Sequence, residues 1–326
     1  MSKPMTYWSV SSQVLIEEAE KLGLKTELLI PEKNFFLVKG NGKEILFKST
    51  DFGQNSSLGF KISNDKELCY SFLERHHFPI AKTRYIDEQD FPKYDWTVFG
   101  DFHFPLVIKP IDGAHGDGVK MNITSISELQ KKLGESFEKY PRMIVQEQIS
   151  GDECRVLVVL GEVTLAIQRN PPVIKGNGES TIHQLISYEN KNNSLRGEGY
   201  NSPLAFIEEN EELIHFVAKQ GHELNQILPS GVQLQLRGNS NLGTGGTLED
   251  ITDTIHPSIK EVCVGIAKEL GLGICGVDIL SSDFTKSLSE TGGVILEVNA
   301  TPGLGGDREL TSVNTGKRIL EKLFTL

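Results

Sequence analysis

The sequence predicts a mixed α+β protein, and three observations support this prediction. Short apolar strand patterns and helical apolar patterns interleave along the 326 residues. Glycine-rich loops follow two of the expected strands, at residues 112–118 and 238–246. Near the C-terminal end, two otherwise apolar strands carry the carboxylates Asp278 and Glu297. Because a charge within a buried strand needs a partner, these positions indicate a functional site.

The bulk composition is that of a globular protein, with 38% hydrophobic and 24% charged residues. The formal net charge of -11 argues against nucleic acid or an anionic membrane as the main partner. No apolar run approaches the roughly 20 residues that span a bilayer. Cys69, Cys154, Cys263 and Cys275 are scattered, with no CxxC pair and no secretory leader, which predicts a reduced cytoplasmic protein.

The first 63 residues predict a small unit of one helix and three strands. The helix is expected at 11–22, ending at Gly23, and the strands at 26–30, 35–38 and 45–47, with a hairpin across Gly40-Asn41-Gly42. A unit of this size buries too little apolar surface to be stable alone, so it should pack on the rest of the chain. Apolar positions expected to be exposed, such as Trp8, are compatible with a homodimer.

A helix is expected to begin at Asn64 or Asp65, with Leu68, Phe72 and Leu73 as its buried stripe. Lys66 lies in the first turn, which is the unfavourable end of the helix dipole for a cation. The lysine therefore either faces an anion or is simply exposed to solvent.

A strand at 104–110 ends in Lys109 and runs into the loop 112–118, which contains three glycines. Such a loop lets backbone N–H groups approach a phosphate chain closely, and a lysine adds a point charge. The pattern matches neither a Walker A loop nor a Rossmann fingerprint, and a glycine-rich turn without function is the alternative. The next strand, 143–149, ends before Ser150-Gly151. Backbone groups of 146–149 could there pair with a planar base, and Glu153 could accept from sugar hydroxyls.

The segment 156–167 predicts a hairpin around Gly161, and a helix follows from Thr181 to Tyr188. A long helical stretch is expected at 208–227, with Leu213, Phe216, Val217 and Leu224 facing inward. The strand 232–236 then leads into Arg237 and a second glycine-rich loop. An arginine at a strand end suits bidentate capture of a carboxylate or phosphate, and an exposed arginine in a long turn is the alternative.

Two strands near the C-terminal end, 274–280 and 294–299, are expected to lie side by side. Asp278, Glu297 and Asn299 would then converge on one point. Carboxylate and amide oxygens without histidine or thiolate suit a hard cation such as Mg2+. The alternative is that both carboxylates are solvated on an edge strand. Helices are expected at 259–270, opened by His256-Pro257, and at 315–323.

Taken in order, these residues resemble the ATP-grasp superfamily of ADP-forming ligases. The resemblance runs from about Asn64 onward and is strongest to the ATP-grasp domain of cyanophycin synthetase and of bifunctional glutathione synthetases. The segments that carry it are Lys109-Pro110-Ile111-Asp112-Gly113-Ala114-His115-Gly116, Gly176-Asn177-Gly178-Glu179-Ser180-Thr181-Ile182, and Asn241-Leu242-Gly243-Thr244-Gly245-Gly246-Thr247 with Thr252-Asp253 and His256-Pro257. Residues 12–19 also resemble the segment that precedes this domain in the bifunctional enzymes.

The resemblance implies an ATP-grasp fold with a small α/β N-terminal domain (1–63), a lid subdomain (64–148) and a catalytic core subdomain (149–326), the last two sandwiching ATP. It also implies a role for each candidate residue. The residues expected to contact ATP are Lys66, Lys109, Gly113, His115, Gly116, Gly118, the adenine hinge Gln146, Glu147 and Ile149, and the ribose ligand Glu153. The metal ligands are Asp278, Glu297 and Asn299, which would hold Mg2+, as two ions, with Mn2+ as a substitute. Arg237, Lys109 and Asn241 are the catalytic candidates, and Arg155 and Arg169 are further candidates for substrate contact.

The implied activity is ATP-dependent joining of an amino acid or small peptide to an amine through an acyl phosphate, with ADP and phosphate as products. Ala114 and the run 304–308 depart from cyanophycin synthetase and argue against cyanophycin itself as the product. The length of the chain favours a free-standing ligase. The alternatives are a ligase that adds glutamate to a protein or cofactor tail, a phosphotransferase, and a nucleotide-binding module without catalysis.

Overall fold

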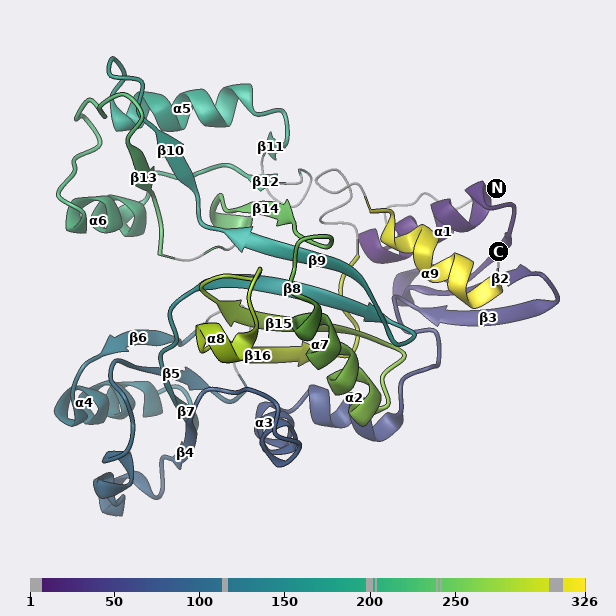
Figure 1. The fold of residues 1–326 in the computed structure, drawn as a ribbon, viewed down its shortest axis with the longest axis horizontal. Coiled ribbons are helices and arrows are strands. Elements are labelled where there is room, and N and C mark those ends of the chain that lie inside the picture. The colour runs from purple at the N-terminus through teal and green to yellow at the C-terminus, as the bar shows by residue number, and fades with distance from the viewer. Residues whose placement is uncertain are drawn as a thin grey trace.

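The computed structural model describes residues 8–112, 117–197, 202, 204–238, 240, 242–304 and 313–325. Within these residues the buried apolar side chains form four clusters, each at the centre of one unit. A five-stranded sheet lies in the middle, with the N-terminal unit at one end and two further units at the other (Figure 1). Helices and sheets are mixed throughout, as the sequence predicted.

The N-terminal unit is a three-stranded antiparallel sheet covered by two helices. Its elements are α1 (Val10–Lys21), β1 (Lys25–Ile30), β2 (Phe35–Gly40), β3 (Lys43–Lys48) and, from the other end of the chain, α9 (Thr315–Phe324). Strand register places Phe36 opposite Phe47, and their stacked rings form the centre of the cluster beneath α1 and α9. The expected helix, the three strands and the hairpin at 40–42 are therefore confirmed.

The central sheet is antiparallel, with the strand order β14-β9-β8-β15-β16. Its strands are β8 (Asp152–Val159), β9 (Glu162–Asn170), β14 (Thr247–Asp250), β15 (Ile274–Ser281) and β16 (Val294–Asn299). The helices associated with it are α2 (Ser57–Ser63), α3 (Lys66–Arg75), α7 (Pro257–Leu270) and α8 (Leu288–Thr291). Strand β15 is apolar except for Asp278 and Ser281, and β8 is apolar from Val156 onward, because these parts are buried on both faces.

The two faces of the central sheet carry different chemistry. On one face Cys154, Val156 and Val277 pack against α7 in the largest cluster. On the other face the side chains change along the strands. Leu157 and Val159 pack on the N-terminal unit at one end, and Arg155 and Asp278 lie toward the other end. The polar end of this second face is the position of the candidate site.

The lid unit is a four-stranded antiparallel sheet of order β4-β7-β5-β6. It consists of β4 (Thr83–Asp87), β5 (Leu106–Pro110), β6 (Lys120–Ile123), α4 (Ile126–Phe137) and β7 (Arg142–Glu147), with two short 3-10 helices, Phe91–Lys93 and Trp96–Phe99. The lid subdomain that the resemblance implies, 64–148, would include α3. In the structure Cys69, Tyr70 and Leu73 of α3 instead belong to the cluster of the central sheet.

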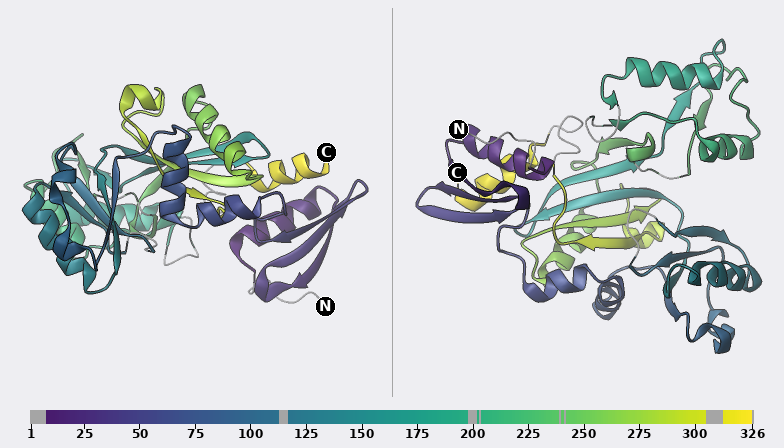
Figure 2. Two further views of the ribbon diagram at one scale, coloured as in Figure 1. Left: turned by 90° about the horizontal axis from the view of Figure 1, so that it is seen from below. Right: turned by 180° about the vertical axis from the view of Figure 1, so that it is seen from behind.

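An inserted unit, residues 173–236, leaves the central sheet after β9 and returns at β14 (Figure 2, right). Its elements are β10 (Val173–Lys175), α5 (Ile182–Asn192), β11 (Arg196–Gly197), β12 (Leu204–Ala205), α6 (Glu211–Lys219) and β13 (Gln233–Gln235). Thr181 caps α5, because its hydroxyl accepts from the Gln184 amide while the Gln184 side chain accepts from the Thr181 amide.

Several sequence-based expectations were wrong. The helix expected at 208–227 is only α6, because Gly221 takes a left-handed conformation (φ +82°) that ends the helix. Leu68 is 50% exposed, since the buried stripe of α3 is Cys69, Tyr70 and Leu73. Helix α2 was not expected. Trp8 is only 5% exposed and packs edge-on against Phe36, so it gives no support to a dimer surface.

Candidate functional site

The candidate site begins with two carboxylates on neighbouring strands. Asp278 of β15 lies directly opposite Glu297 of β16, and Asn299 lies opposite Gly276 two pairs further along. All three side chains are on the polar face of the central sheet, because strand partners share a face. Asp278 is 4% exposed, whereas Glu297 is open to solvent. The structure thus brings together the three residues predicted to ligate a cation.

Arg155 from β8 is the principal partner of Asp278. Its Nε lies 2.7 Å from Oδ1 and its Nη2 lies 2.7 Å from Oδ2, which is a bidentate ion pair. The Asn299 amide nitrogen lies 3.3 Å from Oδ2. Burial opposes the charge of Arg155, but the hydrogen bonds and charge of Asp278 outweigh it and raise the pKa of the guanidinium. A resident cation therefore already neutralises the buried carboxylate.

A second ion pair lies beside the first on the same face. Glu153 of β8 is opposite Arg169 of β9, and their side chains form a salt bridge. Burial raises the pKa of Glu153, and the Arg169 charge opposes that shift. The polar end of the sheet therefore carries two carboxylate–arginine ion pairs next to each other.

Two lysines reach the same region from outside the central sheet. Lys109, on β5, donates from Nζ to the Tyr70 hydroxyl at 2.8 Å, and Lys66, in the first turn of α3, donates to the Ile111 carbonyl oxygen at 3.1 Å. Burial lowers the pKa of Lys109 to about 8, and the Glu297 carboxylate opposes this shift. Burial also lowers the pKa of Lys66, again against the charge of Glu297. Both ammonium groups therefore lie in the field of Glu297.

The predicted hinge segment comprises the last two residues of β7 and the two residues after them. The Glu147 amide donates to the Lys82 carbonyl oxygen, and the Gln148 amide donates to that of Pro105. The Glu147 carboxylate accepts from the His103 amide at 2.8 Å. Among the described residues, the amide of Ile149 has no hydrogen-bond partner. Of the predicted hinge atoms, this amide is available to a ligand.

The glycine-rich loop joins β5 to β6, as expected for a hairpin. Gly113, His115 and Gly116 lie outside the described residues. Gly118 has φ +74°, and a Cβ there would lie 2.6 Å from Pro110 and 2.7 Å from Tyr140. Beside it, Asp117 accepts from the Tyr140 hydroxyl at 2.7 Å. The C-terminal end of the loop is thus anchored on the segment between α4 and β7.

Arg237 directly follows the inserted unit, and its side chain is 1% exposed. Its guanidinium donates to the Glu212 carboxylate at 2.7 Å, the Glu208 carbonyl oxygen at 2.9 Å and the Asn210 side chain at 3.0 Å. Its Nε is buried and has no partner among the described residues. Asn241 lies outside the described residues. These contacts hold Arg237 at the start of α6, and its predicted catalytic role stays a prediction.

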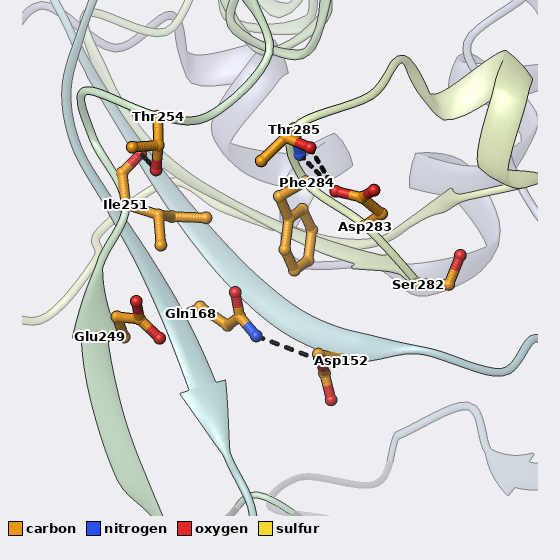
Figure 3. A pocket seen from close by; sticks show the side chains of 9 residues that line it. All are labelled: Asp152, Gln168, Glu249, Ile251, Thr254, Ser282, Asp283, Phe284 and Thr285. Atoms are coloured by element: carbon orange, nitrogen blue, oxygen red, sulfur yellow. Dashed lines mark hydrogen bonds between the residues drawn. The ribbon is translucent and has the colours of Figure 1, made fainter.

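One pocket lies on the opposite face of the central sheet. Asp152, Gln168 and Glu249 line it together with Phe284 and the turn after β15 (Figure 3). Asp152 and Gln168 are on the face of Cys154 and Ala166, which pack on α7. The pocket is therefore separated by the sheet from Asp278 and Glu297.

Sequence reasoning missed Tyr70 entirely. The signal was present, because Tyr70 is four residues after Lys66 on a predicted helix and so lies on the same helix face. Arg155 was only a further candidate, since its contact with Asp278 depends on a strand pairing that the local pattern does not reveal.

No group of three or more histidine, cysteine, aspartate or glutamate side chains in the described ranges is arranged to hold a metal ion. The predicted metal ligands are two carboxylates and the amide of Asn299, so they are not a group of this kind. No helix in the described part of the chain is long and apolar enough to cross a membrane.

Comparison with known proteins places these features in a family. The ATP-grasp domain family matches residues 63–303. Cyanophycin synthetase from Trichormus variabilis is 34% identical over 296 residues, which cover 90% of this chain and 32% of that protein. The bifunctional glutathione biosynthesis protein of Clostridium perfringens is 32% identical, over 97% of this chain and 41% of that protein.

The fold agrees with a solved structure. A bifunctional glutathione synthetase from Pasteurella multocida superposes with a TM-score of 0.77 at 24% identity, covering 98% of this chain and 44% of that one. The chain spans about a third of the length of the cyanophycin synthetases that it matches. The α+β architecture, the two sheets that meet at the site and the match over residues 63–303 together show that this chain belongs to the ATP-grasp family.

Proposed function

We propose that this chain is an ATP-dependent carboxylate–amine ligase that releases ADP and phosphate. The observation that carries the proposal is the meeting of two lysines with the Asp278, Glu297 and Asn299 cluster where the lid unit joins the central sheet. Cations on one side and oxygen ligands on the other suit a polyphosphate that binds between them.

Joining a carboxylate to an amine requires a site that binds ATP and activates the carboxylate. A carboxylate does not react with an amine at neutral pH, because its oxygen is a poor leaving group. In the proposed reaction the carboxylate oxygen attacks the γ-phosphorus of ATP and ADP leaves. The amine then attacks the acyl carbon and loses a proton, and phosphate leaves. The protein positions the reactants and neutralises charge, which accounts for much of the rate in phosphoryl transfer.

Each predicted ATP contact has a proposed place. Lys66 and Lys109 bind phosphate oxygens, and the loop 112–118, with Gly113, His115, Gly116 and Gly118, covers them and excludes water. The Ile149 amide pairs with the adenine edge, beside Gln146 and Glu147. Glu153 binds the ribose after exchanging its contact with Arg169.

Asp278, Glu297 and Asn299 are proposed to hold Mg2+, for which Mn2+ could substitute. Their oxygens fit a hard cation. Among the contacts of the described residues, Asp278 Oδ1 accepts one hydrogen bond, from Arg155, and keeps another acceptor position, whereas Oδ2 accepts from both Arg155 and Asn299. Bound Mg2+ would neutralise phosphate charge and orient the transferred group. The same proposal includes two ions at this site.

Two arginines, Arg237 and Arg155, are proposed candidates to hold the reacting carboxylate or its acyl phosphate, and the contacts of the site favour Arg155. It lies among the carboxylates of the site, whereas the Arg237 guanidinium is held by Glu212 and the start of α6. When a cation takes over the neutralisation of Asp278, Arg155 is released toward an anionic substrate. Arg169 is the second candidate for this contact.

The substrates are proposed to be an amino acid or small peptide with a free carboxylate and a small amine. Two relatives are named for cyanophycin synthesis and glutathione biosynthesis, so aspartate or arginine addition and extension of a glutamyl dipeptide are the first pairs to examine.

The experiment measures ADP and phosphate release from Mg-ATP across amino acids and short peptides, singly and in pairs, with product masses recorded. A ligase requires both a carboxylate and an amine and gives a product lighter than their sum by one water. A phosphorylated product from one compound would identify a phosphotransferase instead. Tight ATP binding without release would favour a binding module, and release only with a protein acceptor would favour a tail-modifying ligase.

A further inference from the structure

Tyr70 occupies the junction between the lysines and the carboxylate strand. It lies on α3 and is 3% exposed. Its hydroxyl accepts a hydrogen bond from Lys109 Nζ at 2.8 Å and donates one to the Leu296 carbonyl oxygen at 2.5 Å. Leu296 immediately precedes Glu297 on β16. One hydroxyl therefore connects a lid strand, a helix and the strand that carries a proposed metal ligand.

A further polar side chain lies close to this hydroxyl. The Gln146 side chain also lies within hydrogen-bonding range of it and donates to the Thr83 hydroxyl at 2.8 Å. The Lys109 ammonium lies 5.0 Å from the centre of the Tyr70 ring, within the range of a cation–π contact. The ring and the hydroxyl together fix where the ammonium lies.

Contacts that hold the Lys109 ammonium in one place favour ligand binding by this lysine. A lysine side chain is long and loses rotamer freedom when it is held in one place. Among the described residues, Tyr70 is the hydrogen-bond partner of Lys109 Nζ, so two of its three N–H groups remain for a ligand. The tyrosine thus orders the lysine before a phosphate arrives and leaves its remaining donors available.

We propose that Tyr70 is a positioning residue for phosphate binding, which holds Lys109 at a fixed place relative to β16 and its carboxylate. The inference rests on the proposed function, because it assigns Lys109 to a nucleotide phosphate. It adds that the effect of Tyr70 on nucleotide binding passes through Lys109. Tyr70 touches no reacting atom in this arrangement.

A double-mutant cycle tests the inference. The affinity for Mg-ADP is measured by calorimetry for the wild type, Tyr70→Phe, Lys109→Met and the double variant. Tyr70→Phe keeps the ring and removes only the hydroxyl. Loss of one hydrogen bond that orders a charged partner predicts roughly 5- to 10-fold weaker binding. In the Lys109→Met background the same change should cost less than about twofold, because there is no ammonium left to position.

Tyr85→Phe is the matched control. Tyr85 is a neighbouring half-buried tyrosine on β4 whose hydroxyl makes no hydrogen bond within the described ranges. Its variant should bind Mg-ADP as the wild type does. An equal loss from Tyr70→Phe in both backgrounds, or no loss in either, would overturn the inference. Unfolding of Tyr70→Phe alone would also overturn it, because Tyr70 would then serve the fold rather than the lysine.

A second measurement separates this inference from the proposed function. The nitrogen NMR signal of Lys109 Nζ, assigned by its loss in Lys109→Met, should be protected from exchange with water in the wild type and lost in Tyr70→Phe. That readout needs neither nucleotide nor turnover. A wild type that binds no nucleotide would overturn the proposed function. An unprotected Lys109 signal in the wild type would overturn the role of Tyr70.

Discussion

Glu297 and Asp278 face each other across two strands, yet they differ in what surrounds them. Asp278 is buried against Arg155, whereas Glu297 is exposed and close to two lysines. Glu297→Gln keeps the shape of the side chain and removes its charge. We expect ADP release to fall at least about 100-fold, the scale of losing one electrostatic group in a site. The free energy of unfolding should fall by no more than about 1 kcal/mol, because Glu297 is exposed although its charge favours the buried ammonium of Lys109.

The control for this prediction is Glu249→Gln, which makes the same change on an exposed glutamate of the opposite face of the same sheet. Its ADP release should match the wild type. Asp278→Asn should lower both activity and stability, because it leaves the Arg155 charge without its partner. Wild-type turnover by Glu297→Gln would remove Glu297 from the proposed metal ligands.

Lys109 should also make stability depend on pH. Its pKa is about 8 in the folded protein, against an ordinary value of 10.5, because the ammonium is buried. Between these two values the unfolded chain binds more protons than the folded one, so the free energy of unfolding rises with pH. Below about pH 8 the buried charge costs its full amount, since lysine is then protonated in both states.

The measurement is urea unfolding of the wild type and Lys109→Met from pH 7.5 to 10. The quantity compared is the difference in unfolding free energy between the two proteins. Buried cysteines and tyrosines, whose pKa values are raised, make the free energy of unfolding fall as the pH rises, and this contribution is common to both proteins. The wild type should gain stability relative to the variant across this range. A constant difference would mean that Lys109 titrates normally.

At the scale of single elements, helix α3 carries both Lys66 and Tyr70 and is fixed at its start by Asp65, whose side chain accepts from the Leu68 amide. Asp65→Ala should cost about 1 kcal/mol of stability, as loss of a helix cap does. Because the cap lies one residue before Lys66, we also expect weaker Mg-ADP binding. Calorimetry and urea unfolding measure the two effects.

Ser125 gives the matched comparison, because it caps α4 in the same way by accepting from the Glu128 amide in the lid unit. Ser125→Ala should lose similar stability and keep its nucleotide affinity. Equal affinities for the two variants would show that the start of α3 does not set the position of Lys66.

Elements with local signals were predictable from the sequence. The helix α7 begins after His256 and ends at Gly271, and the β2–β3 hairpin turns at a glycine pair, as expected. The convergence of Asp278 with Glu297 was also predictable from two short apolar strands near each other in the chain. The pairing of Arg155 with Asp278 joins residues 123 positions apart, and no local pattern specifies such a register. Likewise, Arg237 lies at a strand end as predicted, but its contact with Glu212 depends on how α6 packs.

At the scale of the whole molecule, the two ends of the described chain share one core. Helix α9 packs on α1, and Leu320 and Phe324 lie in the same cluster as Phe36 and Phe47. Lys43 donates to the Leu323 carbonyl oxygen at 2.8 Å. The cluster also includes Leu157 of β8, two residues along the same strand face from Arg155. The N-terminal unit therefore supports one end of the sheet whose other end carries the site.

This shared core predicts which parts unfold together. Leu320→Ala removes a side chain that is fully buried in α9, which should cost about 3 kcal/mol. Because α9 completes the N-terminal core, hydrogen exchange should accelerate in β1–β3 and α1 together with α9, as one cooperative unit. Leu133→Ala is the comparison, because Leu133 is equally buried in the cluster of the lid unit. Its loss should accelerate hydrogen exchange in β4–β7 and leave the N-terminal unit unchanged. Faster exchange in α9 alone after Leu320→Ala would show that the N-terminal sheet keeps its core without the C-terminal helix.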